Sequence, residues 1–363
     1  MRNTLMYSGV VTNIPVECMG YLEFPFKSPL SFLAHEEVLA FYQSYANHYN
    51  LERVVKFQNH VVNVKPVQSN RWEVLSRDLR TKTYEANIFD AIFICNGHYS
   101  APNIPHFDGL DKFKGHICHS HEYRRPDRYK DETVLIIGCG PSGKDILYEV
   151  ASKAKKVIFS HNRDTSRHIL PLNVIQVGDV ERFTEKTVQF VGEVEQQISC
   201  VLFCTGYTFS FPFLSVDCGL SVENKFEVTP LYKHLININC TTMAIVGLQI
   251  CAYSYMYDLQ ARLCLKFWNN EIIIPTKAEM LEDFEAERKR RKETGNNRQT
   301  HLLGVDQNSY LRDISKIGQM IQMPEVLLKI YDDCNELRVQ FPNNYRDFNY
   351  TIIDDQTFER TSN

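Results

Sequence analysis

The sequence predicts an α/β fold, and three local patterns carry this prediction. Residues Val134–Ile137 form a short apolar run that is typical of a buried strand, and a glycine-rich turn follows it directly. A helix pattern begins within that turn, with Ile146, Leu147 and Val150 spaced for one apolar face. A second apolar strand, Val157–Ser160, comes after this helix. Strand, helix and strand in this order are the unit from which doubly wound parallel sheets are built.

The turn between the first strand and the helix has the spacing G-x-G-x-x-G, which predicts a dinucleotide-binding loop. Gly138 permits the tight turn, Gly140 lets the backbone approach a pyrophosphate, and Gly143 lets the helix pack closely on the strand. The first turn of the helix then faces the phosphates with free N–H groups and its positive dipole end. A plain glycine turn is the alternative. The residues that open this helix, and that we expect at the cofactor, are Ser142, Lys144 and Asp145.

The end of the second strand indicates which dinucleotide binds. An NAD-binding unit usually places Asp or Glu about 20 residues after the glycines, where the carboxylate holds the ribose 2′-hydroxyl. Here the strand ends in Ser160, His161, Asn162 and Arg163, and no acid stands among them. Serine and arginine suit a 2′-phosphate, so Ser160 and Arg163 predict a preference for NADPH over NADH. The alternative is a polar strand end that contacts no ligand.

The composition is that of a globular protein without a membrane or nucleic-acid signature. The 363 residues carry a formal net charge of −4, which gives no general affinity for nucleic acid or anionic membranes. The eleven cysteines show no zinc spacing and no C-x-x-C pair, which suits a reduced compartment. The sequence contains no run of about 18 apolar residues and no signal-peptide core. We therefore expect a cytoplasmic protein that spans no membrane.

The remaining segments show helix and strand patterns on both sides of this unit. Apolar residues recur with helical spacing at 35–49 and 257–268, and a charged helix with a solvated face is expected at 278–293. Short apolar or alternating runs predict strands at 54–57, 61–64, 72–75, 84–86, 90–95 and 243–248. We expect the strands at 72–75 and 84–86 to pair antiparallel around a polar turn.

Residues 113–124 contain a longer pattern, F-x-G-x-x-x-H-x-x-x-Y-R, that ends at Tyr123 and Arg124. The histidines of this segment could also suggest a metal, but no carboxylate cluster or cysteine pair completes a metal site. The pattern resembles the fingerprint of the flavin-containing monooxygenases, which stands just before the NADPH glycine motif of that family. Three further motifs are similar to those of the family and occur in family order: Thr12-Asn13 with Phe24-Pro25-Phe26, Leu202–Tyr207 and Leu259–Arg262.

The resemblance implies two Rossmann-like dinucleotide-binding domains, a discontinuous FAD domain and an NADPH domain inserted into it. On this basis we expect FAD-domain segments at 1–127 and 199–363, and the NADPH domain at 128–198. The resemblance also implies hydride transfer from NADPH to FAD, followed by oxygenation of a soft nucleophile. The substrate would be a small amine or sulfide, which reacts together with O2.

The resemblance further places Thr12, Asn13 and Gln260 at the flavin, with Asn13 as the catalytic residue. An amide there can donate and accept hydrogen bonds without moving a proton. Taken on its own, Asn13 could equally be a turn residue.

One departure from the family concerns the start of the FAD domain. Family members begin with a strand–glycine loop–helix unit that binds the ADP part of FAD, and no such unit precedes Thr12 in this sequence. We therefore expect an N-terminally truncated FAD domain that holds FAD weakly, because the FAD pyrophosphate needs N–H donors and a helix N-terminus. Two functions stay open: an FAD- and NADPH-dependent monooxygenase, and a flavin-free, catalytically inactive NADP-binding or interaction protein.

Overall fold

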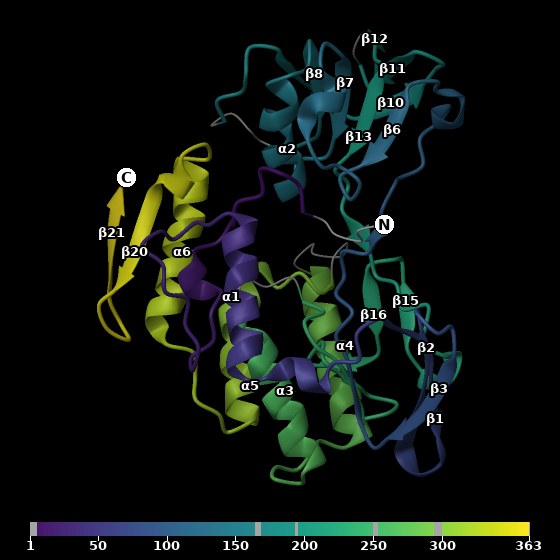
Figure 1. Ribbon diagram of the computed structural model, residues 1–363, viewed down its shortest axis with the longest axis vertical. Helices are drawn as coiled ribbons and strands as arrows, with labels where there is room; N and C mark the ends of the chain where they lie inside the picture. The colour runs from purple at the N-terminus through teal and green to yellow at the C-terminus, as the bar shows by residue number, and fades with distance from the viewer. Residues whose placement is uncertain (1–5, 164–167, 193–194, 250–252, 294–299, 363) are drawn as a thin grey trace.

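The polypeptide folds into two lobes, and a computed structural model describes residues 6–163, 168–192, 195–249, 253–293 and 300–362 of it. In Figure 1 the upper lobe holds helix α2, a parallel sheet and the sheet of β10, β11 and β12, and the lower lobe holds the longer helices and several small sheets. The C-terminal strands β20 and β21 lie beside helix α6. The α/β class predicted from the sequence is confirmed.

The upper lobe is built on a five-stranded parallel sheet of strand order β6-β13-β7-β8-β9. Its strands are β6 (His116–His119), β7 (Thr133–Ile137), β8 (Lys156–Ser160), β9 (Val174–Val177) and β13 (Cys200–Phe203). Helix α2 (Pro141–Ala151) covers one face, where it packs on Ile136 and Leu202. A second sheet covers the other face and packs on Leu135 and Phe203. This second sheet consists of β10 (Val180–Phe183), β11 (Thr187–Phe190) and β12 (Gln196–Gln197).

This double coverage explains why the strands appear in the sequence as continuous apolar runs rather than as alternating patterns.

The strand order of this sheet bears on the predicted domain boundaries. Strand β13 lies between β6 and β7 and pairs in parallel with both. Both β6 and β13 lie outside the predicted segment 128–198, so we propose that the nucleotide-binding lobe extends from His116 to Phe203.

The lower lobe combines a four-stranded mixed sheet with a group of helices. The sheet has the order β17-β18-β19-β4, made of β17 (Leu231–Tyr232), β18 (Ile236–Asn237), β19 (Met243–Ile245) and β4 (Ile92–Ile94). Its largest core cluster joins this sheet to α3 (Tyr255–Trp268), α5 (Gln307–Ile317) and α6 (Glu325–Gln340). Helices α1 (His35–His48) and α4 (Lys277–Glu293) also belong to this lobe, and Met280 of α4 is part of the same core cluster. Among the described residues, no helix combines the length and apolar character that a membrane crossing needs.

Short strands complete the lobe and the connection between the lobes. An antiparallel sheet contains β1 (Asn59–Val67), β2 (Arg71–Asp78) and β3 (Tyr84–Phe89). Three antiparallel pairs are formed by β5 (Ala101–Pro102) with β14 (Tyr207–Thr208), β15 (Ser221–Glu223) with β16 (Glu227–Thr229), and β20 (Phe348–Ile352) with β21 (Phe358–Ser362).

The predicted helices and the antiparallel pair of 72–75 with 84–86 are confirmed, with ends displaced by a few residues. The strand predicted at 54–57 is wrong. Residues Leu51–Val54 form a short 3-10 helix, and β1 begins only at Asn59. Asn50 and Gln58 bracket the segment in left-handed conformations, with φ of 51° and 58°, so the chain turns instead of extending. Val54 and Phe57 are exposed in consequence.

Candidate cofactor site

The glycine turn after β7 has the geometry that its sequence predicts. Gly138 has φ of +106°, and a Cβ there would stand 2.5 Å from the carbonyl oxygen of Cys204. Gly143 lies in the first turn of α2, where a Cβ would stand 2.0 Å from the carbonyl oxygen of Gly138. Both glycines are therefore required by close backbone approach, which brings α2 down onto the strand.

Gly140 differs from these two glycines. A Cβ at this position would meet no atom within 4 Å, so packing within the protein does not require glycine there. The residue directly precedes α2, whose first N–H groups have no partner within the helix. Open space in front of a helix N-terminus is the arrangement that admits an anionic group such as a pyrophosphate.

A pocket of about 450 Å³ opens beside this turn. It lies between the glycine loop, the end of β8 and the start of β10, and its lining includes Gly138, Cys139, Ser160, Arg163 and Asp179. The structure therefore brings the predicted dinucleotide loop together with both residues predicted to select NADPH. The volume is in the range of small-molecule sites.

The two side chains predicted to select NADPH differ in their availability to a ligand. Ser160 is buried, and its Oγ donates to the carbonyl oxygen of Gly178 at 2.7 Å. Its proton is used within the protein, so Ser160 is a poor donor to a phosphate. Arg163 is exposed and lines the pocket, and a guanidinium group suits a phosphate partner.

Asp179 is the residue at this pocket that the sequence reasoning missed. The sequence shows no acid at the end of β8, but the fold brings Asp179 to the pocket from the turn after β9. The Nδ2 of Asn162 donates to its Oδ2 at 2.5 Å. A carboxylate here opposes a 2′-phosphate, so Arg163 and Asp179 act in opposite directions on cofactor choice.

The other residues predicted at the NADPH loop divide into two groups. Ser142 and Lys144 are partly exposed in the first turn of α2, near the turn that would hold a pyrophosphate. Asp145 is engaged elsewhere, because the guanidinium of Arg346 donates to both of its carboxylate oxygens, at 3.2 and 3.0 Å. Arg346 lies 201 positions further along the chain, and no sequence signal pointed to it.

The residues predicted at the flavin differ in exposure and in the contacts they make within the protein. Asn13 is exposed, whereas Thr12 is partly buried and its Oγ1 accepts the N–H of Leu33 at 3.1 Å. Gln260 is fully buried, and its Oε1 accepts the N–H of Gly247 at 2.9 Å. Its Nε2 donates to Gln249 Oε1 and to Tyr310 Oη, at 2.8 Å each. The amide of Gln260 is therefore saturated by the protein itself.

The fingerprint at 113–124 is a structural element of the nucleotide lobe. Gly115 stands where a Cβ would lie 2.3 Å from the Phe113 ring and from the Ser199 carbonyl oxygen. Tyr123 is buried, and its Oη donates to Glu149 on α2 at 2.7 Å. The pattern thus fixes β6 against β13 and then ties the following loop to α2. Among the described residues, no group of three or more His, Cys, Asp or Glu side chains is placed to hold a metal ion.

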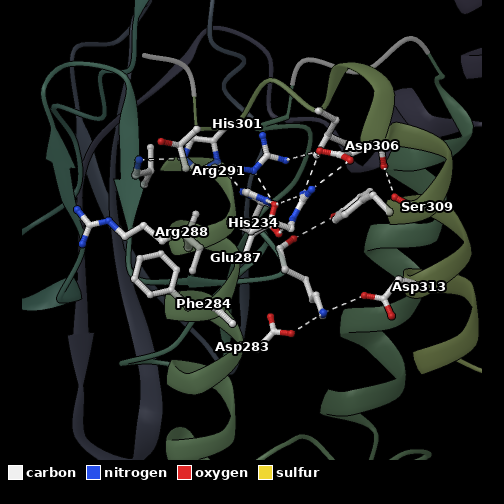
Figure 2. A pocket seen from close by; sticks show the side chains of 18 residues that line it. His234, Asp283, Phe284, Glu287, Arg288, Arg291, His301, Asp306, Ser309 and Asp313 are labelled. Atoms are coloured by element: carbon white, nitrogen blue, oxygen red, sulfur yellow. Dashed lines mark hydrogen bonds and ion pairs between the residues drawn. The ribbon is translucent and has the colours of Figure 1, made fainter. Parts of the chain in front are cut away.

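A second pocket, of about 420 Å³, lies in the lower lobe among α4, α5 and β17. Figure 2 shows His234, His301, Glu287 and Arg291 gathered around it. The His301 Nε2 accepts the N–H of Val228 at 2.9 Å, which leaves the proton of a neutral ring on Nδ1. That Nδ1 donates to the Nδ1 of His234 at 3.0 Å.

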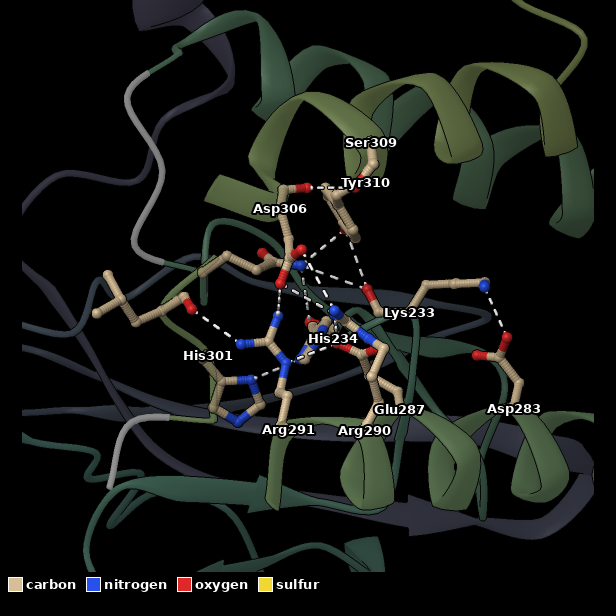
Figure 3. Close-up of polar contacts among 12 residues, drawn as sticks. Lys233, His234, Asp283, Glu287, Arg290, Arg291, His301, Asp306, Ser309 and Tyr310 are labelled. Atoms are coloured by element: carbon tan, nitrogen blue, oxygen red, sulfur yellow. Dashed lines mark hydrogen bonds and ion pairs between the residues drawn. The ribbon is translucent and has the colours of Figure 1, made fainter. Parts of the chain in front are cut away.

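The cluster continues toward Gln260 through Tyr310 and Lys233, as Figure 3 shows for the last two. The Tyr310 Oη lies 2.8 Å from the Gln260 Nε2 and donates to the carbonyl oxygen of Lys233 at 3.0 Å. The ammonium of Lys233 pairs with Asp283 at 2.6 Å and with Asp313 at 2.8 Å. Opposite charges of this pocket pair with each other within the protein.

We expect the free energy of unfolding to decrease as the pH is lowered, and His301 to be one cause of this decrease. Burial, with smaller effects of His234 and Arg291, holds the pKa of His301 well below its usual value of 6.5. Below that pH the unfolded chain binds a proton that the folded protein excludes, so stability falls by about 1.4 kcal/mol per pH unit for this group. In His301→Gln an amide oxygen can still accept the Val228 N–H, and this part of the slope should disappear.

Urea unfolding of both proteins between about pH 7 and pH 5 measures the difference in slope. His106→Gln is the matched control, because it makes the same substitution at an exposed histidine instead of a buried one. Equal slopes for wild type and His301→Gln would contradict the assignment of His301 as a buried neutral group.

Comparison with known proteins identifies the family. A family model described as flavin-binding monooxygenase-like matches residues 2–166 and 161–350. Flavin-containing monooxygenase FMO GS-OX5 of Arabidopsis thaliana is 32% identical over 328 residues, which are 86% of this chain and 71% of that protein. S-allyl-L-cysteine S-oxygenase from Allium sativum is 28% identical, with a TM-score of 0.88 over 95% of this chain and 81% of that one.

Tmm from Pelagibacter sp. strain HTCC7211 shares the fold, with a TM-score of 0.86 over 99% of this chain and 82% of that one, at 23% identity. The fold and the site therefore define an α/β oxidoreductase built to hold dinucleotides. The chain belongs to the flavin-binding monooxygenase-like family. The resemblance found in the motifs is confirmed, as are the predicted fold class and the membership of an enzyme family that uses flavin.

Proposed function

We propose that this protein is an NADPH- and FAD-dependent monooxygenase that transfers one oxygen atom to a soft nucleophilic nitrogen or sulfur of a small molecule. The observation that carries the proposal is the glycine turn at Gly138–Gly143, open at Gly140 and flanked by the pocket of Arg163. Family membership supplies the reaction class. The S-oxygenase from Allium sativum supports sulfur as the preferred atom.

The residues that we propose to bind NADPH have roles that follow from their positions. The first N–H groups of α2, in front of Gly140, receive the pyrophosphate of NADPH, and Lys144 and Ser142 lie in the same turn. Arg163 contacts the 2′-phosphate. Bound flavin supplies the electron transfer and the dioxygen chemistry of the reaction.

The residues proposed at the flavin are Thr12, Asn13 and Gln260. Asn13 is exposed, so its amide is free to face a ligand, and its carboxamide can hydrogen-bond without discharging a proton. We propose Asn13 as the catalytic residue on this basis. Gln260 acts one step away, by holding the backbone of Gly247 through its Oε1.

Loss of Arg163 should weaken NADPH binding about ten- to a hundredfold and NADH binding little, because a guanidinium–phosphate contact is worth about 1.5–3 kcal/mol. Asp179→Asn should act in the opposite direction and favour NADPH. Ser160→Ala is the matched control with little effect on either cofactor, since its hydroxyl serves Gly178. Fluorescence titration of Arg163→Ala with both cofactors makes the measurement. Equal losses for NADPH and NADH would show that Arg163 does not contact the 2′-phosphate.

A second candidate function is NADP(H) binding without flavin. One observation favours it. In the described part of the chain, the glycine turn between a parallel strand and the start of α2 is the site at which a pyrophosphate would bind. One turn of this kind binds one pyrophosphate, and this one is assigned to NADPH. The two candidates differ in a visible spectrum. Residues 1–363, mixed with excess FAD and passed over a desalting column, retain a flavin band under the first candidate and lose it under the second.

A further inference from the structure

Arg346 joins segments that lie far apart in the sequence. Its Nη1 and Nη2 donate to the two carboxylate oxygens of Asp145 on α2, and its Nε donates to the carbonyl oxygen of Thr12 at 3.0 Å. The ring of Tyr345 lies 4.9 Å from the guanidinium carbon and supports it. All three hydrogen bonds are charge-assisted and issue from one planar group, so they fix the directions of Asp145 and Thr12 relative to each other.

The segment that carries Arg346 is itself anchored on the nucleotide lobe. The side-chain Oδ1 of Asn343 accepts the N–H of Ile169 at 3.0 Å. Its Nδ2 donates to the carbonyl oxygen of Ile169 at 3.1 Å and to the Oη of Tyr148, on α2, at 2.7 Å. The segment 343–346, which runs into the short helix η8 (Tyr345–Asp347), therefore contacts α2 at two points one turn apart: Arg346 binds Asp145, and Asn343 binds Tyr148.

The other end of the bridge is the loop that contains Asn13. The N–H of Thr12 donates to the carbonyl oxygen of Leu33 at 2.9 Å, and the N–H of His35 donates to that of Val10 at 3.1 Å. Because the Leu33 N–H also donates to the Thr12 Oγ1, this short pairing positions the loop from one side. Arg346 holds the remaining carbonyl oxygen, the one that directly precedes Asn13.

We infer that Arg346 is a positioning residue that holds the Thr12-Asn13 loop in a fixed place relative to α2. The inference rests on the proposed function, because it takes α2 as the seat of the dinucleotide and Asn13 as the reacting group's neighbour. Transfer between two bound cofactors requires reacting atoms about 3–3.5 Å apart, so the two loops must keep a constant separation. Asp145, expected at the cofactor, is the α2 end of this bridge.

Hydrogen–deuterium exchange of the cofactor-free protein tests the bridge without any reaction. The reporters are the N–H groups of Thr12, Leu33 and His35. In Arg346→Gln they should exchange about ten- to a hundredfold faster, because local opening no longer breaks charge-assisted hydrogen bonds. In Asp145→Asn, a change on the other lobe, exchange at the same N–H groups should also rise, by a smaller factor. The double variant should match Arg346→Gln alone.

Two further variants separate positioning from general loosening. Arg346→Lys keeps the charge but not the fork and should give intermediate rates. Arg360→Gln removes an ion pair of 2.7 Å with Asp333 in the same C-terminal segment and should leave the three reporters at wild-type rates. Wild-type rates at Thr12 in Asp145→Asn, or additive effects in the double variant, would overturn the inference.

NADPH titration of the wild type is run in parallel and tests the proposed function alone. A wild type that fails to bind NADPH but shows the coupled exchange defeats the proposed function and keeps the bridge. If the wild type binds NADPH but Asp145→Asn leaves the exchange rates of the three N–H groups unchanged, the inference about Arg346 is wrong and the proposed function stands.

Discussion

Gly140→Val lowers the affinity for NADPH by about a hundredfold or more, while the protein stays folded. The physical reason is that Gly140 is in contact with the ligand's place but not with the packed interior of the protein. No protein atom lies within 4 Å of the place where a Cβ would stand, so the side chain is tolerated. The same space is where a pyrophosphate would meet the first N–H groups of α2, and losing two charged hydrogen bonds costs about 1.5–3 kcal/mol each.

The free energy of unfolding of Gly140→Val should be lower than that of the wild type by no more than about 1 kcal/mol. This small loss arises mainly because valine is a poorer N-cap than glycine. NADPH titration and urea unfolding of the same preparation measure both quantities. Gly140→Ala is the matched control and should lose less affinity, in proportion to its smaller side chain. Unchanged NADPH affinity in Gly140→Val would remove the glycine turn from the cofactor site.

Gly143→Ala has the opposite balance and should destabilise the fold itself by about 3 kcal/mol. A Cβ at this position would lie 2.0 Å from the carbonyl oxygen of Gly138, a backbone atom that cannot rotate away. Helix α2 would have to move away from the sheet. This movement would disturb the packing of Ile146, Leu147 and Val150, which are fully buried on its inner face. NADPH binding should be lost together with stability.

Urea unfolding followed by circular dichroism gives the free energy of unfolding of Gly143→Ala, with an unchanged slope against denaturant. Ser142→Ala changes the neighbouring, partly exposed residue and should stay within about 0.5 kcal/mol of the wild type. A Gly143→Ala protein of wild-type stability would show that helix and strand are not in close backbone contact.

The sequence predicted what local chemistry determines. The strand, turn and helix at 134–146 follow from an apolar run and three glycines, and the structure gives each glycine its expected surroundings. The strand predicted at 54–57 failed because apolar residues there occupy an exposed turn set by left-handed residues on both sides. An apolar run alone does not show whether any partner covers it.

Contacts between distant segments could not be predicted in the same way. The fingerprint at 113–124 was found as a pattern, but only the fold shows that it supplies strand β6 and the Tyr123–Glu149 hydrogen bond. Asp179 and Arg346 reach the site through the packing of separate elements. Asp145 and Gln260 have the residue types that bind cofactors, yet both are hydrogen-bonded within the protein. Residue type at a motif position predicts proximity to a site better than it predicts the contact made there.

The proposed function makes a direct statement about where an oxygen atom comes from. Residues 1–363 are incubated with excess FAD, NADPH and a small thioether under 18O2. Mass spectrometry then measures the 18O content of the sulfoxide. We predict one labelled oxygen per sulfoxide, one NADPH consumed per product, and loss of both in Gly140→Val. Absence of sulfoxide in the presence of bound FAD and NADPH, or a sulfoxide oxygen that comes from water, would contradict the proposal that this chain is a flavin-dependent monooxygenase.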